Sequence, residues 1–254
     1  MIEIALCLAI IGVGLVAIVG VLPIGLNTQR DTREETVVNQ DATVLLEAIR
    51  NGQHGADDLT NYVYAITNYW TLYNANGNVA GSGIDGYNYQ GSQVTKIAPP
   101  PSIPLTNGAN IIGLLSTPEF TTNASGFYLP IPTLFNNNGY SNHVVAYVRS
   151  LSGLATEKPP QNNDLMVGDS FSYRIYCVNA GVPFDTNRPF AGYVRQLFAN
   201  EHELRMTFLW PQQPNGSLGS GRHTYRTTIA GQLGTNAANQ GLYFYQPQTF
   251  KPQP

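Results

Sequence analysis

The first 26 residues form an apolar run of membrane-spanning length. It carries no charge from Ile4 to Leu22, and about 18 or more apolar residues suffice to cross a bilayer as a helix. A secretory signal peptide instead has a basic start, a shorter apolar core and a small-residue cleavage site. No basic residue precedes this run. We therefore expect residues 1–26 to form a hydrophobic helix rather than a signal peptide.

A single carboxylate, Glu3, lies at the start of this run. A charge in the hydrocarbon core costs about 2.5 to 3.5 kcal/mol on insertion scales, so such groups usually have a partner. The first turn of a helix also favours a negative charge, because the helix macrodipole is positive there. Glu3 is therefore a candidate functional residue.

The helical pattern continues through residues 27–52. Four apolar residues follow the 4-3-4 spacing of one helix face, namely Val38, Ala42, Leu45 and Ile49. The charged residues lie off that stripe: Arg30, Glu34, Asp41 and Glu47. Gly52, preceded by Arg50, is a typical helix stop. We predict one helix of about 75 Å from residue 1 to about 51, apolar all round in its first half and amphipathic in its second.

Pro23 interrupts this helix in the sequence. A proline inside a helix removes one hydrogen bond and clashes with the preceding turn. The glycines around it, which are weak helix formers, are Gly12, Gly14, Gly20 and Gly25. These residues predict a kink or a locally unwound stretch between about Gly12 and Gly25.

The composition favours an extracellular protein that packs against copies of itself. Charged residues make up 11% of the 254 residues, against about 25% in a typical soluble domain. Few charges would then need desolvation on assembly. A net charge of −3 indicates no basic stripe for nucleic acid. Cys7 lies in the apolar run and Cys177 in a distant strand-like segment, so we expect both to be free.

Residues 53–254 are expected to form a globular head with an antiparallel sheet. Apolar and polar residues alternate in several short segments, as they do in half-buried strands. These segments are residues 143–149, 171–177, 203–210 and 223–229, with 242–245 as a further candidate and 211–221 as a long hairpin loop. Residues 57–73 are predicted to begin as a second helix, 74–142 to be loop-rich decoration of the core, and 246–254 to be a proline-rich tail. The expected fold is α+β, with the sheet on the amphipathic half of the long helix.

No motif of catalysis or cofactor binding stands out, so we expect no enzyme and no cofactor. Residues 12–17 match a dinucleotide-binding pattern by letter, but no strand precedes them. Glu201–Glu203 is interpreted as a solvated strand edge rather than a metal site, and His223 as a cross-strand polar partner. Residues 85–88 and 162–164 are weak calcium-site candidates. Asn123 and Asn215 begin glycosylation sequons.

Four features of the first 50 residues occur together in a known family. They are the start at Ile2, Glu3 and Ile4, the apolar helix through Leu26, the helix-breaking Pro23, and the abrupt change to charged residues 29–35. In these features the chain resembles a processed type IV pilin or a related pseudopilin. The remaining residues vary widely in that family, although residues 204–226 are similar to the C-terminal part of some large pilin-like proteins. Mature pilins usually have an aromatic first residue and a slightly deeper glutamate, so the identity of the N-terminal amine stays open.

The resemblance implies an assembly mechanism. Glu3 would pair with the N-terminal amine, here that of Met1, on a neighbouring subunit, and Pro23 with its glycines would let the helix stretch or bend. A prepilin peptidase would first remove a short leader and methylate the new N-terminus. A pilus assembly machinery would then extract the subunit, so that the helix leaves the inner membrane and packs with copies of itself in an extracellular, adhesive helical filament. The alternatives are a pseudopilin of a type II secretion system and a membrane-anchored extracytoplasmic binding domain. The large, charge-poor head favours the exposed filament.

Overall fold

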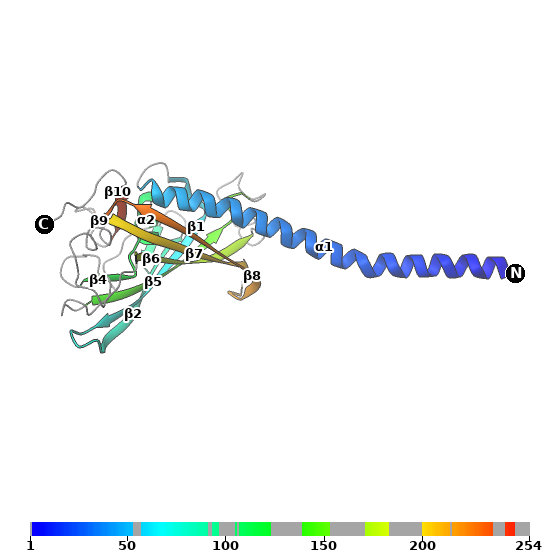
Figure 1. Cartoon of the computed structure of the whole chain (residues 1–254), viewed down its shortest axis with the longest axis horizontal. Coiled ribbons are helices and arrows are strands. Elements are labelled where there is room, and N and C mark those ends of the chain that lie inside the picture. Colours follow the sequence, from blue (N-terminus) through cyan, green and yellow to red (C-terminus); the bar gives the residue numbers. More distant parts are fainter. Residues whose placement is uncertain are drawn as a thin grey trace.

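The computed structural model describes residues 2–52, 57–90, 93–96, 105, 107–122, 139–152, 171–182, 200–213, 215–235 and 242–246. It has an α+β architecture in which one long helix, α1 (Ile2–Arg50), carries a head built on an antiparallel sheet (Figure 1). The N-terminal part of α1 projects away from the head, and its C-terminal part lies along one face of the sheet.

The C-terminal part of α1 packs through the predicted apolar stripe. Val38, Ala42, Leu45 and Ile49 are all fully buried, which confirms the prediction. The helix ends at Arg50, and Gly52 has a φ of +70° that favours glycine. A Cβ atom at this position would lie 3.1 Å from the Tyr245 carbonyl oxygen, so glycine is also required for packing.

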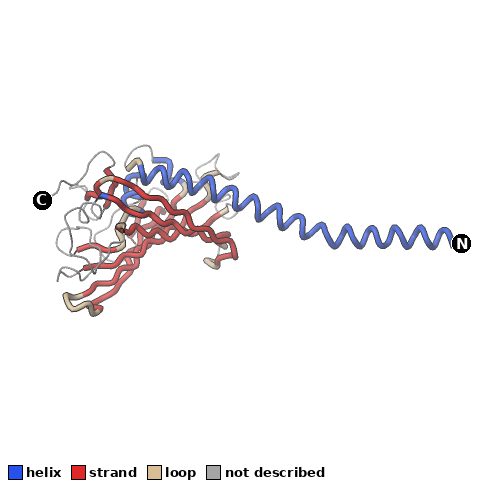
Figure 2. The backbone as a smooth tube through the Cα atoms, in the orientation of Figure 1, coloured by secondary structure: helices blue, strands red, loops and turns tan. Residues whose placement is uncertain are grey.

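The predicted unwound stretch is absent. Helix α1 is continuous across Pro23 and across Gly12, Gly14, Gly20 and Gly25. Nothing lies within 4 Å of a Cβ built on any of the four glycines. The helix axis bends between its projecting part and the part on the sheet (Figure 2), which accommodates a proline while the helix continues.

The main sheet has the strand order β3-β2-β1-β5-β6-β7-β8, and neighbouring strands are antiparallel. These strands are β1 (Val63–Tyr73), β2 (Val79–Gln90), β3 (Gln93–Lys96), β5 (Gly139–Arg149), β6 (Ser172–Gly181), β7 (Glu201–Gln212) and β8 (Leu218–Ala230). Strand β4 (Phe120–Thr122) pairs with the start of β5, while β9 (Gln232–Thr235) and β10 (Tyr243–Gln246) form a separate two-stranded sheet.

The four alternating segments are strands, as predicted, and β10 lies within one residue of its expected position. On β6 and β7 the apolar residues of the alternation, such as Ile175, Leu204 and Phe208, are fully buried under α1. The loop between β7 and β8 is shorter than predicted, because β7 extends to Gln212 and β8 begins at Leu218.

Two predictions about residues 57–142 are wrong. Residues 57–73 form a short 3₁₀ helix, η1 (Asp57–Asn61), followed by strand β1 instead of a second α-helix. Within residues 74–142 the described helix α2 (Gly108–Leu115) contributes to the core, since it buries Ile111 and Ile112 completely. Asn107 caps α2, its side-chain oxygen accepting a hydrogen bond from the Asn110 amide at 2.8 Å.

Two glycines in strands sit beneath tryptophan rings. Gly83 pairs with Trp70 across β1 and β2, and Gly221 pairs with Trp210 across β7 and β8. A Cβ at either glycine would lie 2.5 Å from the indole, so any other residue would displace the ring. Glycine here allows the rings to cover the strands, although it weakens a strand elsewhere.

Candidate functional site

The projecting part of α1 is an exposed apolar surface. Every side chain described from Ile2 to Arg33 is exposed. Up to Leu26 this includes 14 large aliphatic side chains, each at least 52% exposed. By length and composition the helix can span a bilayer, and none of its most apolar 18-residue window is buried in the head. These residues therefore have no packing partner in the part of the chain that the structure describes.

Glu3 is exposed at the start of this surface. It has no hydrogen bond or ion pair with another residue in the described part of the chain. Met1, the other residue of the expected pairing, lies outside the described residues. A carboxylate in an apolar environment needs a charged or hydrogen-bonding partner, and the described residues of this chain do not supply one to Glu3.

Residues 30–36 form a polar stretch of α1, here called the neck, between the apolar surface and the part of the helix that lies on the sheet. Arg30 Nε donates to Glu34 Oε1 at 2.8 Å, one turn along the helix. This hydrogen bond and the charge of Glu34 raise the Arg30 pKa. Thr32 and Thr36 donate their hydroxyls to carbonyls one turn back, each at 2.8 Å. The neck is thus hydrophilic, and several of its side chains bond within the helix itself, as expected at the boundary of an apolar environment.

Asp41 fixes α1 on the head, a role that the sequence did not indicate. It was expected off the apolar stripe, yet it is fully buried. Its two carboxylate oxygens accept four hydrogen bonds, from the Leu151 and Ser152 amides at 2.9 Å, the Ser152 hydroxyl, and the Tyr173 hydroxyl at 2.9 Å. Burial, and then the charge of Asp41, hold the Tyr173 pKa well above its usual value.

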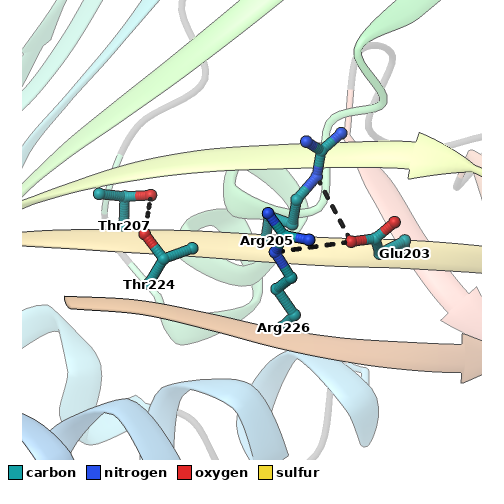
Figure 3. Close-up of polar contacts among 5 residues, drawn as sticks. All are labelled: Glu203, Arg205, Thr207, Thr224 and Arg226. Atoms are coloured by element: carbon teal, nitrogen blue, oxygen red, sulfur yellow. Dashed lines mark hydrogen bonds and ion pairs between the residues drawn. The ribbon is translucent and has the colours of Figure 1, made fainter.

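The segment Glu201–Glu203 does not lie at a sheet edge, so that prediction is wrong. Strand β7 lies between β6 and β8. His202 is fully buried, and its ring meets Tyr245 at a centroid distance of 5.6 Å. Glu203 points to the opposite face of the sheet, where it lies between Arg205 and Arg226 (Figure 3).

Other positions singled out in the sequence are His223, the sequon residues Asn123 and Asn215, and the calcium-site candidate at residues 162–164. His223 is exposed and its ring packs on Tyr225 of its own strand at 4.6 Å, not on a polar residue across the sheet. Asn215 is exposed in the β7–β8 turn, where its side-chain oxygen accepts from the Ser217 amide at 2.9 Å. Asn123 and residues 162–164 lie outside the described residues.

Cysteine and metal chemistry add little to the described part of the molecule. Cys7 and Cys177 are both free, as predicted, with Cys7 exposed on α1 and Cys177 buried in β6. Burial raises the pKa of the Cys177 thiol to about 12, so it stays protonated and unreactive at neutral pH. Among the described residues no group of three His, Cys, Asp or Glu side chains could hold a metal ion.

No protein family, curated protein or solved structure was found to match this chain. The arrangement of the described residues therefore carries the functional argument. In that arrangement the N-terminal half of α1 is apolar and exposed, with Glu3 as a lone carboxylate at its start. The C-terminal half of the same helix packs on the head.

Proposed function

We propose that this protein is a structural subunit of an extracellular type IV-like filament, assembled through its N-terminal helix. The observation that carries the proposal is the exposed apolar half of α1, which is continuous with the half that packs on the head. Such a helix offers the same surface first to lipid and then to copies of itself. The first 50 residues, which resemble a type IV pilin, support the same proposal.

The size of the exposed surface supports a partner that covers the whole helix. Fully burying a Val, Leu or Ile side chain contributes about 1.5 to 3 kcal/mol. For the 14 exposed aliphatic residues the total is on the order of 20 kcal/mol, which exceeds the usual net stability of a domain. Exposure to water is therefore strongly unfavourable, and the helix needs lipid, detergent or neighbouring helices.

Glu3 would select the position of each subunit in the filament. In a bundle of apolar helices an unpaired carboxylate costs several kcal/mol, so a subunit is stable only where Glu3 meets a positive group. The proposed group is the N-terminal amine of a neighbouring subunit. Such a contact joins unlike surfaces of successive copies, which produces an open helical assembly rather than a closed ring.

A plain membrane anchor is the second candidate, because an exposed apolar helix near the N-terminus also fits that role. The two differ in what Glu3 does. An anchor gains nothing from a carboxylate at this depth, whereas an assembly contact requires it.

A Glu3→Ala variant separates these candidates. We expect normal membrane insertion and a strong loss of sheared surface fibres, measured by electron microscopy and by the amount of this chain in the sheared fraction. Asp31→Ala is the matched control, since Asp31 is exposed on the same helix in the neck, and it should assemble normally. Normal fibre yield from Glu3→Ala would remove the proposed role of Glu3, and surface fibres that lack this chain would remove the filament proposal.

A further inference from the structure

The sheet face opposite α1, here called the outer face, concentrates positive charge. On β7 the residues Leu204, Met206 and Phe208 are buried toward the helix, so the alternate residues lie on the outer face. The strand register then places five of the chain's 13 basic residues there, Arg149, Arg174, Arg205, Arg222 and Arg226, together with two acidic residues of β7, Glu201 and Glu203. Without these seven residues the chain, which carries −3 in total, would have a net charge of −6.

Two of these arginines already have a counter-charge. Arg205 Nε and Arg226 Nε lie 3.6 and 4.0 Å from the same Glu203 oxygen. Beside them the hydroxyls of Thr207 and Thr224 are hydrogen bonded across the strands at 2.9 Å (Figure 3). One carboxylate thus serves two guanidinium groups, so the charge of this part of the outer face is partly compensated.

Arg149 and Arg174 have no carboxylate partner among the described residues. Each guanidinium instead lies over a tyrosine ring, Arg149 over Tyr64 at 4.6 Å and Arg174 over Tyr147 at 4.8 Å. The two rings are 6.1 Å apart, so both positive charges belong to one cluster. Cation–π contacts stabilise a guanidinium but do not neutralise its charge.

The burial of Arg149 is the second observation. Its residue is 9% exposed, and its Nη1 atom is buried without a hydrogen-bond acceptor. Arg174 Nε is likewise buried without an acceptor, whereas Arg174 Nη2 donates to the Gly216 carbonyl at 3.2 Å. Burial lowers the Arg149 pKa, in keeping with an uncompensated charge. An unpaired buried charge is costly, so an arrangement of this kind suits an anion that binds from outside.

The surroundings of the two arginines indicate what kind of anion fits. Tyr69 and Tyr176, both near Arg174, are 42% and 37% exposed. Each offers an apolar ring face and a hydroxyl at one position. A guanidinium binds a carboxylate through paired hydrogen bonds. A ring-shaped ligand with apolar faces, several hydroxyls and a carboxylate matches this combination.

We propose that Arg149 and Arg174, with the tyrosines around them, form a binding site for the carboxylate of an acidic carbohydrate. Arg174, which is partly exposed, makes the contact, and the buried Arg149 supplies the second charge. The site depends on the head alone and goes beyond the filament proposal. In that filament this face would be turned away from the helical core.

An extended nucleic acid fits the outer face less well. Its affinity depends on many phosphate contacts along a track. Here the basic residues form no continuous track, because the register places Leu209 of β7 between Arg174 and Arg222, and the rest of the molecule is acidic. A short ligand with few carboxylates needs only the local charge of Arg149 and Arg174.

The test is calorimetric titration of tetragalacturonate into the full chain in neutral detergent, which does not depend on filament assembly. We expect saturable binding that Arg174→Gln weakens by about tenfold or more, as expected when a charge-assisted bidentate contact is lost. Arg222→Gln is the matched control, because it removes an equal charge from an exposed position on the same face and should change affinity less than twofold. The methyl ester of the same tetrasaccharide should not bind.

Arg149→Met distinguishes a ligand-binding role from a structural one. If the buried charge serves a ligand, the variant binds tetragalacturonate at least tenfold more weakly, while its thermal midpoint is unchanged or raised. Four results would overturn the proposal: no binding by the wild type, equal effects of Arg174→Gln and Arg222→Gln, retained binding of the methyl ester, or tighter binding of an oligothymidylate than of tetragalacturonate.

Discussion

Asp41 connects three parts of the chain that are far apart in sequence. It brings together α1, the Leu151–Ser152 segment after β5, and Tyr173 on β6. Each carboxylate oxygen accepts two hydrogen bonds, so the buried charge is satisfied without a basic partner. Hydrogen bonds to backbone amides also fix the rotation of α1 about its axis, which apolar contacts alone define less sharply.

Replacing this carboxylate should strongly destabilise the head. In an Asp41→Ala variant two amides and two hydroxyls lose their acceptor, and an unsatisfied buried group costs about 1 to 3 kcal/mol. We expect a loss of about 3 to 5 kcal/mol in the free energy of unfolding, measured by denaturant titration in detergent. Asp31→Ala, at an exposed position, should change it by less than about 0.5 kcal/mol. A similar small effect at Asp41 would contradict the assigned role.

Buried tyrosine and cysteine groups predict weakening of the fold at alkaline pH. Burial raises the pKa of Cys177 and of Tyr243 to about 12 each, and that of Tyr173 well above its usual value. Above pH 9 to 10 the unfolded chain releases these protons while the folded chain keeps them. Stability is therefore complete below that range and falls as the pH rises, by about 1.4 kcal/mol per pH unit for each such group.

The measurement is the free energy of unfolding between pH 8 and pH 11. In Cys177→Ala one titrating group is removed, so the decline should begin later and be shallower than in the wild type. The absolute stability at pH 8 also falls because a small cavity is created, but this does not affect the slope. An identical slope in both proteins would contradict the assignment.

Buried charged residues such as Asp41 were the hardest to predict from the sequence. A carboxylate is almost never fully buried, so the helical pattern reasonably placed Asp41 in solvent. Its partners lie more than 100 residues away, and no local spacing brings them together. The tyrosines in contact with Arg149 and Arg174 likewise come from neighbouring strands, Tyr64 of β1 and Tyr147 of β5, which no local spacing predicts. By contrast, Val38, Ala42, Leu45 and Ile49 were predicted correctly because their burial follows from helical periodicity alone.

Among the helices and strands, too, those with a clear local sequence pattern were predicted, and those that depend on tertiary contacts were missed. Strands β6, β7 and β8 were predicted because each alternates in apolar character over one half-buried face. Strand β2 was missed because it contains Gly81, Gly83 and Gly86, and glycine is depleted in strands. Its pairing with β1 depends on a tryptophan that covers Gly83, which is a tertiary contact. Helix α2 was missed because its eight residues are too short and too uniformly apolar to show a helical period.

The end of α1 is a point where one residue controls an element. Gly52 adopts a φ of +70° against the Tyr245 carbonyl. Gly52→Ala should destabilise the head by about 1 to 2 kcal/mol, from backbone strain and a contact that is too close. Gly81→Ala, where a Cβ meets nothing within 4 Å, should be neutral or slightly stabilising. Thermal unfolding of both variants in detergent would show this, and equal midpoints would contradict it.

At the scale of the whole molecule, the projecting helix and the head are independent. Because the side chains described from Ile2 to Arg33 are exposed, they add no contacts to the core. A chain that begins at Thr28 should therefore fold in water without detergent, with a free energy of unfolding within about 0.5 kcal/mol of the full chain. Circular dichroism and size-exclusion chromatography would measure this. Aggregation or unfolding of the shortened chain would show that the projecting helix supports the head.

The continuity of α1 has a mechanical consequence. A force that pulls the head along the helix axis acts parallel to the surface on which Val38, Ala42, Leu45 and Ile49 are buried. The contacts are then loaded in shear and must break together, whereas a force perpendicular to the axis would separate them one after another. Asp41 lies within the same stretch, so its four hydrogen bonds share that load. A chain built this way resists tension best in the direction of its own longest dimension.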